Sequence, residues 1–374
     1  MMLPGHATAT GTARFRARFP ELACAGHFRQ PDPHNHLNDL WLSSIGLGTY
    51  LGEPDSATDA RYTDAVIEAV RTGVNLLDTA INYRFQRSER SIGAAIAKLE
   101  SAGIGRNELL VCTKAGYLTY DASVPADPRA YFMKEYIETG IIPQRELVGG
   151  MHCMAPSYLS DQIERSRRNL GIETIDLFYL HNPEQQLSEV SREVFDSRLR
   201  AAFTALENAV ADGKICVYGT ATWNGYRQDA ESREYLDLAK IELIAREAGG
   251  EGHHFRAIQL PFNLGLPEAF TLQNQRSGSA QVSTLQLAQE LRISVVTSAT
   301  LMQGRLAARL PQFVRDRMKS GTDAEAAIQF ARSAPGILTA LIGMSRKEHV
   351  EANLKVASKP LAGKEDWESL FSKK

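Results

Sequence analysis

VNLLDTA, residues 74–80, decides the fold, because ELLVCTKAG (108–116) repeats its pattern after one intervening helical segment. Both are short apolar runs that barely alternate with polar residues, which is typical of strands covered on both faces. Between them, SERSIGAAIAKLES (88–101) has apolar residues three and four apart, which indicates an amphipathic helix. A strand, a helix and a second strand predict one right-handed parallel unit.

Six further apolar runs extend this repeat along the chain. They are SSIGLGTY (43–50), IDLFYLH (175–181), ICVYGTAT (215–222), RAIQLPFN (256–263), ISVVTSAT (293–300) and ILTALIGMS (337–345). Helical periodicity between them recurs in TDAVIEAVRTG (63–73), LSDQIERSRRNLG (159–171) and LRAAFTALENAVADGK (199–214). Eight strand–helix units predict an α/β protein, a single (β/α)8 TIM barrel over residues 43–374. An open doubly wound sheet is the alternative, but GLGTYLG lacks the GxGxxG spacing of its first turn.

The first 42 residues do not fit the repeat. GTARFRARF (11–19) alternates, which predicts an extra strand or hairpin at the barrel floor. PDPHNHLND (31–39) is rich in turn residues, and its His34 and His36 raise the question of a metal site. Two histidines two apart in a loop are more often solvated side chains, so we predict no metal there.

Composition argues against several classes of function. The chain has 374 residues and a net charge of -2, with 43% hydrophobic and 23% charged residues, the balance of a soluble globular protein. No global field favours nucleic acid or an anionic membrane. No stretch approaches the ~20 apolar residues that span a bilayer, and residues 1–19 lack the apolar core of a signal peptide. The four cysteines are widely spaced without a CxxC pair, so we expect reduced thiols and a cytoplasmic protein. The sequence leaves the oligomeric state open.

Polar residues stand where three neighbouring predicted strands end. Asp78 closes the second run and Tyr83 follows in its loop, while Lys114 ends the third run and His181 the fourth. The active site of such a barrel lies at the C-terminal ends of the strands, so these side chains should converge on one face. Each residue alone has a local explanation as a cap or a salt bridge. The four together are hard to explain in that way.

These four side chains make sense as proton-transfer machinery. A free phenol has a pKa of about 10. A positive charge about 4 Å away, at an effective dielectric of ~20, contributes about 4 kcal/mol, roughly three pKa units, which would bring Tyr83 near 7. Lys114 supplies that charge, Asp78 holds the ammonium, and His181 orients a substrate oxygen. Tyr83 then donates a proton to a carbonyl oxygen as hydride reaches the carbon, and a nicotinamide cofactor must supply the hydride.

At this point the chain resembles the aldo-keto reductase family. The motifs that carry the resemblance are GLGTY (46–50), LLDTAINYR (76–84), TKAG (113–116), DLFYLH (176–181), Gln259 with Asn263, and IGMSRKEHVEANL (342–354). They occur in family order over most of the chain. The resemblance implies an NAD(P)H-dependent oxidoreductase that reduces an aldehyde or ketone to an alcohol, or the reverse. It also implies that Tyr83 is the general acid, in a catalytic set with Asp78, Lys114 and His181.

The last motif indicates where a cofactor would bind. Ser345 and Glu348 predict a capping box at the start of a helix. Arg346 and Lys347 then lie in its first turn, against the helix dipole, which favours a bound phosphate, with a solvated basic patch as the alternative. The family resemblance implies an adenosine-phosphate site here, with NADP(H) expected ahead of NAD(H). The cofactor-binding residues that it implies are Gly48, Thr49, Tyr50, Asp78, Thr222, Asn224, Gln259, Ser298, Arg305, Gly343, Ser345, Arg346, His349 and Asn353.

Several departures from the family pattern affect the cofactor contacts. GTATW stands where the family usually reads like GVSNF, so Ala221 and Thr222 replace a Ser and an Asn. Ser298 stands where an aromatic usually stacks on the nicotinamide, and Gly343 with Met344 replaces a Lys-Ser pair. These changes weaken a strict NADP preference. They also leave open an alternative, a cofactor-binding regulatory subunit of this fold with little turnover.

Two features of the sequence bear on the substrate, a long insertion and a set of aromatic residues. Residues 117–156 form an insertion of ~40 residues without core periodicity, and loops of that length are usually functional or disordered, so we expect an ordered lid over the barrel mouth. His152 and Cys153 within it have no visible second pair of metal ligands. The pocket wall should include Tyr50, Tyr117 and Trp223, and aromatic walls suit apolar or sugar-like carbonyls and alcohols.

Overall fold

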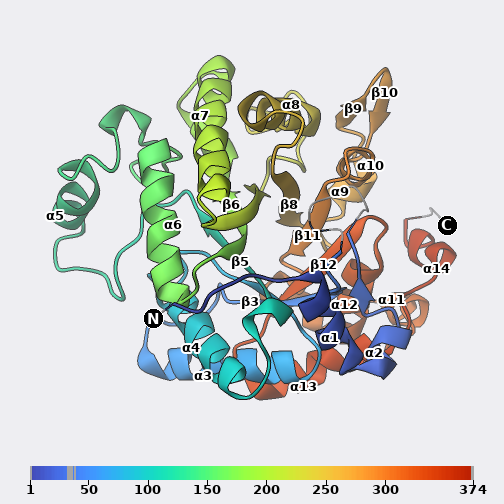
Figure 1. The fold of residues 1–374 in the computed structure, drawn as a ribbon. Helices are drawn as coiled ribbons and strands as arrows, with labels where there is room; N and C mark the ends of the chain where they lie inside the picture. Colours follow the sequence, from blue (N-terminus) through green and yellow to red (C-terminus); the bar gives the residue numbers. More distant parts are fainter. Residues whose placement is uncertain (1, 32–36, 38, 372–374) are drawn as a thin grey trace.

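A closed parallel barrel forms the centre of the computed structural model, which describes residues 2–31, 37 and 39–371. Its eight strands follow the order β11–β12–β3–β4–β5–β6–β7–β8 (Figure 1). Their bounds are β3 Ile45–Gly48, β4 Leu76–Asp78, β5 Leu110–Ala115, β6 Ile175–His181, β7 Ile215–Ala221, β8 Phe255–Pro261, β11 Ser294–Ser298 and β12 Ile337–Gly343. Each predicted apolar run overlaps one of these strands, and the prediction of a (β/α)8 barrel is confirmed.

Helices surround the barrel, and several of them begin or end at a capping residue. The longer helices are α3 Ser56–Arg71, α4 Arg87–Ser101, α6 Pro156–Leu170, α7 Arg192–Ala211, α8 Leu238–Gly249, α10 Thr284–Glu290, α12 Asp323–Ser333 and α13 Lys347–Leu354. Asp55 caps α3 by accepting the Thr58 N–H at 2.7 Å, and Gly171 ends α6 in the left-handed conformation with φ 67°. Across the described residues, none of the helices has the length and apolar character needed to cross a lipid bilayer.

Shorter helices and strands lie outside the barrel. They are α1 Ala9–Ala17, α2 Pro20–Cys24, β1 Phe28–Arg29, β2 Leu42–Ser43, α5 Pro128–Phe132, α9 Glu268–Thr271, β9 Gln275–Ser277, β10 Ala280–Val282, α11 Gln312–Arg317 and α14 Lys364–Glu368. The strands β9 and β10 form an antiparallel hairpin that projects at the upper right of Figure 1. None of these elements interrupts the barrel.

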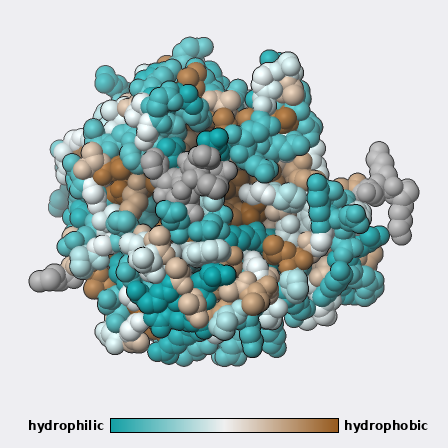
Figure 2. Space-filling model, turned by 45° about the vertical axis from the view of Figure 1, so that its right-hand side comes forward, coloured by the Kyte–Doolittle hydropathy of each residue, from teal (hydrophilic) through white to brown (hydrophobic). Residues whose placement is uncertain are grey.

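Apolar residues are divided between the inside of the barrel and the layer beneath the helices. Alternate strand residues such as Leu76, Leu110 and Leu177 form the inner cluster, which also includes Leu40 and Leu42 from the N-terminal segment. That segment therefore packs against the barrel floor. On the face shown in Figure 2, hydrophilic side chains dominate and apolar residues occur in small separate groups.

The prediction of a strand or hairpin at residues 11–19 is wrong, because Ala9–Ala17 forms helix α1. Thr8 caps this helix by accepting the Gly11 N–H at 3.0 Å. Phe15 and Phe19 are separated by an even number of residues, as the alternating pattern requires, but that separation is four, which is also helical spacing. Their ring centroids lie 5.2 Å apart. The alternation was therefore compatible with both periods, and the cap favours the helix.

The strand pairing near the floor is shorter and lies elsewhere. The two-residue strands β1 and β2 pair antiparallel, with Phe28 opposite Ser43 and Arg29 opposite Leu42. His34 and His36, the histidines considered as metal ligands, lie outside the described residues.

The insertion at 117–156 packs on the outside of the barrel against α6. Arg165 of α6 forms an ion pair with Glu135 at 2.6 Å, and the Tyr136 ring lies 6.0 Å from that of Tyr158. Helix α5 lies at the left edge of Figure 1, beside α6. Tyr117, at the start of the insertion, lines a cavity at the barrel mouth. That the remainder acts as a lid stays a prediction.

Asp176, near the start of β6, fastens the N-terminal segment to the barrel. Its Oδ1 accepts the Ala7 N–H at 2.6 Å. Its Oδ2 accepts the Arg106 guanidinium at 2.5 Å and the Val111 N–H at 2.8 Å. Both charged side chains are almost fully buried, at 3% exposure for Arg106 and 2% for Asp176. Each buried charge is thus stabilised by its partner, and removing one would leave the other unpaired.

Removing this carboxylate should destabilise the protein strongly. We expect Asp176→Ala to lower the free energy of unfolding by about 3–5 kcal/mol, because it leaves a buried arginine without its partner. Arg200→Ala is the matched control, since the Arg200–Glu247 pair is exposed on both sides, and such pairs contribute only about 0–1 kcal/mol. Urea unfolding measures both. Equal, small losses in the two variants would contradict a structural role for Asp176.

Candidate active site

The ends of β4, β5 and β8 meet at a buried ion pair. Lys114 Nζ donates to Asp78 Oδ2 at 2.5 Å and to the Thr79 carbonyl at 2.8 Å. The Gln259 side-chain amide donates to the other carboxylate oxygen of Asp78 at 2.8 Å. Lys114 is fully buried and Asp78 is 3% exposed. A charge buried this deeply is tolerated only when it is paired and hydrogen-bonded.

Tyr83 and His181 lie around this ion pair. Lys114 Nζ is 5.2 Å from the centroid of the Tyr83 ring. The ring centroids of Tyr83 and His181 are 5.8 Å apart, and the angle between the two ring planes is 77°. The Tyr50 ring packs edge-on against Tyr83 at 5.1 Å. The structure therefore brings together the four side chains that the strand ends predicted.

The turn after Tyr83 has an unusual backbone conformation. Residues 84–86 are not glycines, yet their φ angles are 49°, 56° and 71°, in the left-handed region that costs side-chain-bearing residues energy. The buried guanidinium of Arg84 holds this turn, since its Nε donates to the Glu53 carbonyl at 2.9 Å and it forms an ion pair with Asp59. These contacts connect the Tyr83 loop to the loop after β3 and to the first turn of α3.

Burial and the nearby ammonium act in opposite directions on Tyr83. Burial raises the pKa of Tyr83, the Lys114 charge lowers it, and the net shift is upward from the usual value near 10. The expectation of a pKa near 7 was therefore too low. It counted the attraction of the charge but not the cost of removing a phenolate from water. At neutral pH Tyr83 keeps its proton.

The other groups of the site have defined charge states. Burial lowers the pKa of Lys114, but the Asp78 charge, the Tyr83 phenol and the hydrogen bond to Asp78 together raise it above its usual value, so the ammonium stays charged. Burial raises the pKa of Asp78, although its contacts with Lys114 and Gln259 favour the carboxylate. Burial and the Lys114 charge hold the pKa of His181 well below its ordinary value, so the imidazole is neutral. A neutral imidazole offers one N–H donor to a ligand.

His152 is hydrogen-bonded to the backbone of His181. Its Nε2–H donates to the His181 carbonyl at 2.8 Å, and its Nδ1 accepts from the Gln186 amide at 2.8 Å. Gly116 allows this packing, because a Cβ there would lie 2.4 Å from the same carbonyl oxygen. Burial lowers the pKa of His152 to about 4. These bonds explain His152 without a metal ion.

Two cavities meet at Tyr83. The first has a volume of about 580 Å³ and the second of about 420 Å³. Both are lined by Tyr50, Tyr83, Gln259 and Ser298. The first continues along Tyr117, His181, Thr222, Trp223 and Arg305. The second runs along Gly48, Thr49, Asp78, Gly343, Ser345, His349 and Asn353, so it reaches the start of α13.

Two of the predicted cofactor residues line neither cavity. The Asn224 side chain donates to Glu234 Oε2 at 2.8 Å, and its backbone N–H donates to Glu184. Arg346 is exposed at the start of α13. All the other predicted cofactor residues, and the three predicted wall residues Tyr50, Tyr117 and Trp223, line one cavity or both.

The predicted capping box at the start of α13 is wrong. The helix begins at Lys347 with Arg346 as its N-cap, and no side chain within the described part of the chain caps it. Ser345 lies one residue too early to accept the first N–H groups, and it lines the second cavity instead. The start of α13 therefore presents N–H groups without a side-chain cap beside two exposed cations, Arg346 and Lys347.

Unpartnered buried hydroxyls mark both cavities as sites for a polar ligand. Thr222 Oγ1 and Thr300 Oγ1 are buried, and neither has a hydrogen-bond partner among the described residues. Buried polar atoms in proteins are normally hydrogen-bonded. The second cavity extends from Tyr83 to the uncapped start of α13, which suits an elongated ligand with an anionic end, such as a nicotinamide dinucleotide.

Several cavity residues were not predicted from the sequence. They are Asn82, Asn182, Leu266, Ala299, Met302 and Gln303 in the first cavity. Asn82 and Asn182 directly adjoin Tyr83 and His181, and that adjacency was the available signal. Met302 and Gln303 come from the loop after β11, where both have positive φ angles that their residue types do not signal.

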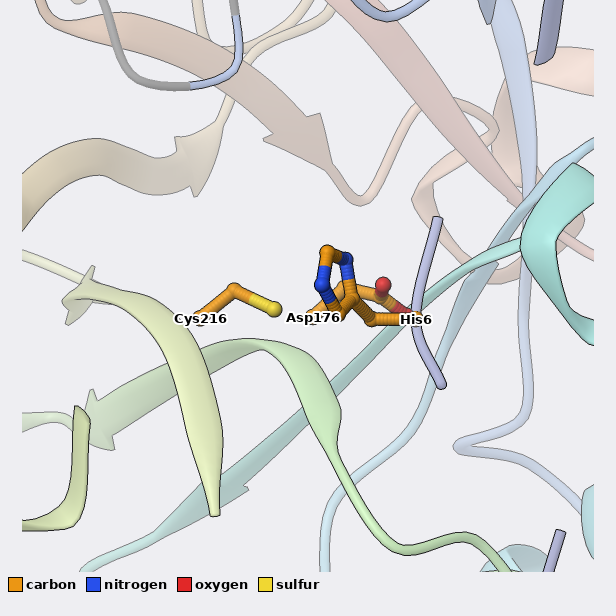
Figure 3. Close-up of side chains that lie close together, drawn as sticks. All are labelled: His6, Asp176 and Cys216. Atoms are coloured by element: carbon orange, nitrogen blue, oxygen red, sulfur yellow. The ribbon is translucent and has the colours of Figure 1, made fainter. Parts of the chain in front are cut away.

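His6, Asp176 and Cys216 lie close together, with possible ligand atoms within 4.8 Å of one another (Figure 3). The Asp176 carboxylate already accepts the Arg106 guanidinium and two backbone N–H groups. His6 Nδ1 bonds the Ala7 carbonyl at 2.8 Å. An arginine on the carboxylate opposes a second cation, and hydrogen bonds account for the positions of His6 and Asp176.

Comparison with known proteins gives one family. A model of the Aldo/keto reductase family matches residues 44–245. The NADH-specific methylglyoxal reductase of Escherichia coli K12 is 28% identical over 212 residues, 55% of each chain. The D-threo-aldose 1-dehydrogenase of a Pseudomonas species is 31% identical over 170 residues, 41% of this chain and 42% of that protein. The chain spans about half the length of the curated relatives that it matches.

Solved structures share the fold. An aldo/keto reductase of Klebsiella pneumoniae in complex with NADP and acetate gives a TM-score of 0.61 at 19% identity, over 91% of this chain and 94% of that one. The glycerol dehydrogenase of Gluconobacter oxydans gives a TM-score of 0.62 at 18% identity, over 93% and 94%. At these identities the likeness concerns the fold alone.

The buried imidazole of His152 should make stability depend on pH. Its pKa is about 4 in the folded protein, whereas an unfolded histidine titrates near 6.5. The unfolded chain therefore binds the proton first, and the free energy of unfolding falls by up to about 3 kcal/mol from this residue as pH drops from about 6.5 to 4. Urea unfolding across this range should show a shallower fall for His152→Gln than for the wild type. Comparison at about pH 7.5 separates the loss of hydrogen bonds from titration, and an unchanged slope would contradict the assignment.

Proposed function

Because the chain belongs to the aldo/keto reductase family, we propose that it is an NAD(P)H-dependent oxidoreductase that reduces an aldehyde or ketone to an alcohol, or catalyses the reverse. The convergence of a buried lysine–aspartate pair, a tyrosine and a histidine where two cavities meet carries this proposal. One cavity has room for a small substrate, and the other suits an elongated cofactor.

Tyr83 is the proposed proton donor. Its raised pKa keeps the proton on Oη at neutral pH, and the Lys114 ammonium stabilises the phenolate that remains after transfer. The neutral His181 donates a hydrogen bond to the substrate oxygen and so orients it toward Tyr83. Asp78 holds Lys114 in place. A bound nicotinamide supplies or accepts the hydride.

The proposed substrate is a small carbonyl compound with further oxygen atoms, or the matching alcohol. Tyr50, Tyr117 and Trp223 give the first cavity apolar walls, while Asn82 and Asn182 add amide groups beside the catalytic residues. A few polar groups among aromatic walls are typical of sites that orient small polar ligands. The names of both curated relatives, a methylglyoxal reductase and an aldose dehydrogenase, agree with this class.

For the cofactor we propose NADP(H) ahead of NAD(H). Arg346 and Lys347 are exposed beside the uncapped start of α13, and within the described residues neither forms an ion pair. Such a site favours an additional phosphate. One structural neighbour was solved with NADP, whereas one curated relative is named as NADH-specific. The cations of this chain are the reason for the preference.

The regulatory alternative, cofactor binding with little turnover, is less well supported. Both curated relatives are named as oxidoreductases, and a protein that only binds the cofactor would not need the complete catalytic group.

The four cysteines are unpaired, which suits a reducing compartment such as the cytoplasm.

Tyr83→Phe should abolish turnover while leaving cofactor binding nearly unchanged. The substitution removes only the phenolic hydroxyl, and loss of a positioned general acid typically costs about 10²–10⁴ in rate. Fluorescence titration with NADPH measures binding, and carbonyl reduction measures turnover. A variant that kept wild-type kcat would remove Tyr83 from the mechanism. Wild-type protein that bound NADPH and reduced no carbonyl would favour the regulatory alternative.

Arg346→Ala with Lys347→Ala should weaken NADPH binding about tenfold and leave NADH binding within about twofold. Two charge-assisted contacts to a phosphate account for an effect of that size, and NADH lacks this phosphate. Lys98→Ala, in the last turn of α4, is the control for loss of an exposed cation. Equal effects on both cofactors would contradict a phosphate-specific role.

A further inference from the structure

Glu184 lies behind the wall of the first cavity, in the short helical segment Pro183–Ser188 that follows β6. Its side chain is buried, and its Oε1 accepts three successive backbone N–H groups. The distances are 2.7 Å to Trp223, 3.0 Å to Asn224 and 3.4 Å to Gly225. Consecutive N–H groups that converge on one point form a nest, which favours a negative charge.

The loop that Glu184 holds carries part of the cavity wall. Trp223 lines the first cavity and is 49% exposed, and Thr222 before it presents its unpartnered hydroxyl at the same wall. The Trp223 carbonyl accepts from Arg227 Nε at 3.0 Å, and the Thr222 N–H donates to the Gln259 carbonyl at 2.8 Å. The backbone N–H groups of residues 223–225 all donate to Glu184.

Other contacts of this loop do not replace those of Glu184. Glu234 accepts only the side-chain amide of Asn224, at 2.8 Å. Without Glu184, the N–H groups of residues 223–225 would lose their acceptor, and a partly buried donor without a partner destabilises the conformation that buries it. The loop would then relax away from its present position.

We propose that Glu184 is a positioning residue, whose carboxylate holds residues 222–225 so that Trp223 and Thr222 form the wall of the substrate cavity and whose charge tunes substrate affinity. The effect on affinity rests on the proposed function. The effect on the loop does not.

The charge of Glu184 should change near neutral pH. Burial raises the pKa of Glu184 to about 7, against the backbone N–H groups that lower it. The titratable groups facing it are Tyr117 and Tyr226, whose pKa values are raised by burial and then by its charge, while Glu234 lies across Asn224. Oε2 has no partner in the described part of the chain, so it can take the proton while Oε1 still accepts. Charge-assisted hydrogen bonds are about twice as strong as neutral ones, so the loop loosens as pH falls through this value.

Glu184→Gln tests the loop directly, because the amide has the shape of the protonated acid but cannot ionise. By hydrogen–deuterium exchange at about pH 8, we expect the amides of residues 223–225 to lose about tenfold in protection, while the wild type at about pH 6 approaches the variant. Glu234→Gln is the matched control and should leave these amides protected. Glu184→Asp, which keeps the charge, should recover part of the protection. Equal protection in Glu184→Gln and the wild type at the higher pH would overturn the proposal.

Kinetics on the full-length protein tests the second part. Glu184→Gln should raise KM for a small aldehyde about fivefold with kcat within about twofold, since a loosened wall weakens binding without touching the proton donor. The wild type should show a similar rise in KM between about pH 8 and 6, and the variant should not. Altered exchange with unchanged KM would remove Trp223 and Thr222 from the substrate wall. A wild type without any turnover, but with the exchange difference intact, would refute the proposed function and not the role of Glu184 in the loop.

Discussion

A buried ion pair between Lys114 and Asp78 constrains the whole site, because neither charge can remain at the barrel mouth without the other. Lys114 comes from β5 and Asp78 from β4, while Gln259 reaches the free carboxylate oxygen from β8. Strands on different sides of the barrel are thereby joined through one carboxylate. Tyr83 and His181 lie around the ammonium, and both cavities begin at this point. The proposed reaction therefore takes place beside this pair.

Burial and the ammonium charge together set the protonation states of the neighbouring side chains. His181 is neutral because burial and the ammonium both oppose a second positive charge. Tyr83 stays protonated because burial outweighs the attraction of Lys114 for a phenolate. A protonated phenol is the state required for reduction of a carbonyl. Oxidation of an alcohol requires the phenolate as base, so it should gain from rising pH more than reduction does.

The sequence predicted the parts of the molecule that local patterns specify. Strands buried on both faces produce continuous apolar runs, and Asp78, Lys114 and His181 each end such a run. The prediction of a strand at residues 11–19 was wrong because their apolar spacing fits both a strand and a helix. Glu184 was missed because its partners lie about forty positions later in the chain and bind through backbone atoms, which leave no trace in side-chain identity.

Transfer of deuterium from cofactor to product tests the central claim most directly. The protein would be incubated with NADPH deuterated at the transferable position of the nicotinamide and a panel of small aldehydes and hydroxyketones, and the products examined by mass spectrometry. Our account predicts one deuterium on the former carbonyl carbon, because the hydride comes from the nicotinamide and only a proton comes from Tyr83. Oxidised cofactor together with an unlabelled alcohol would contradict it.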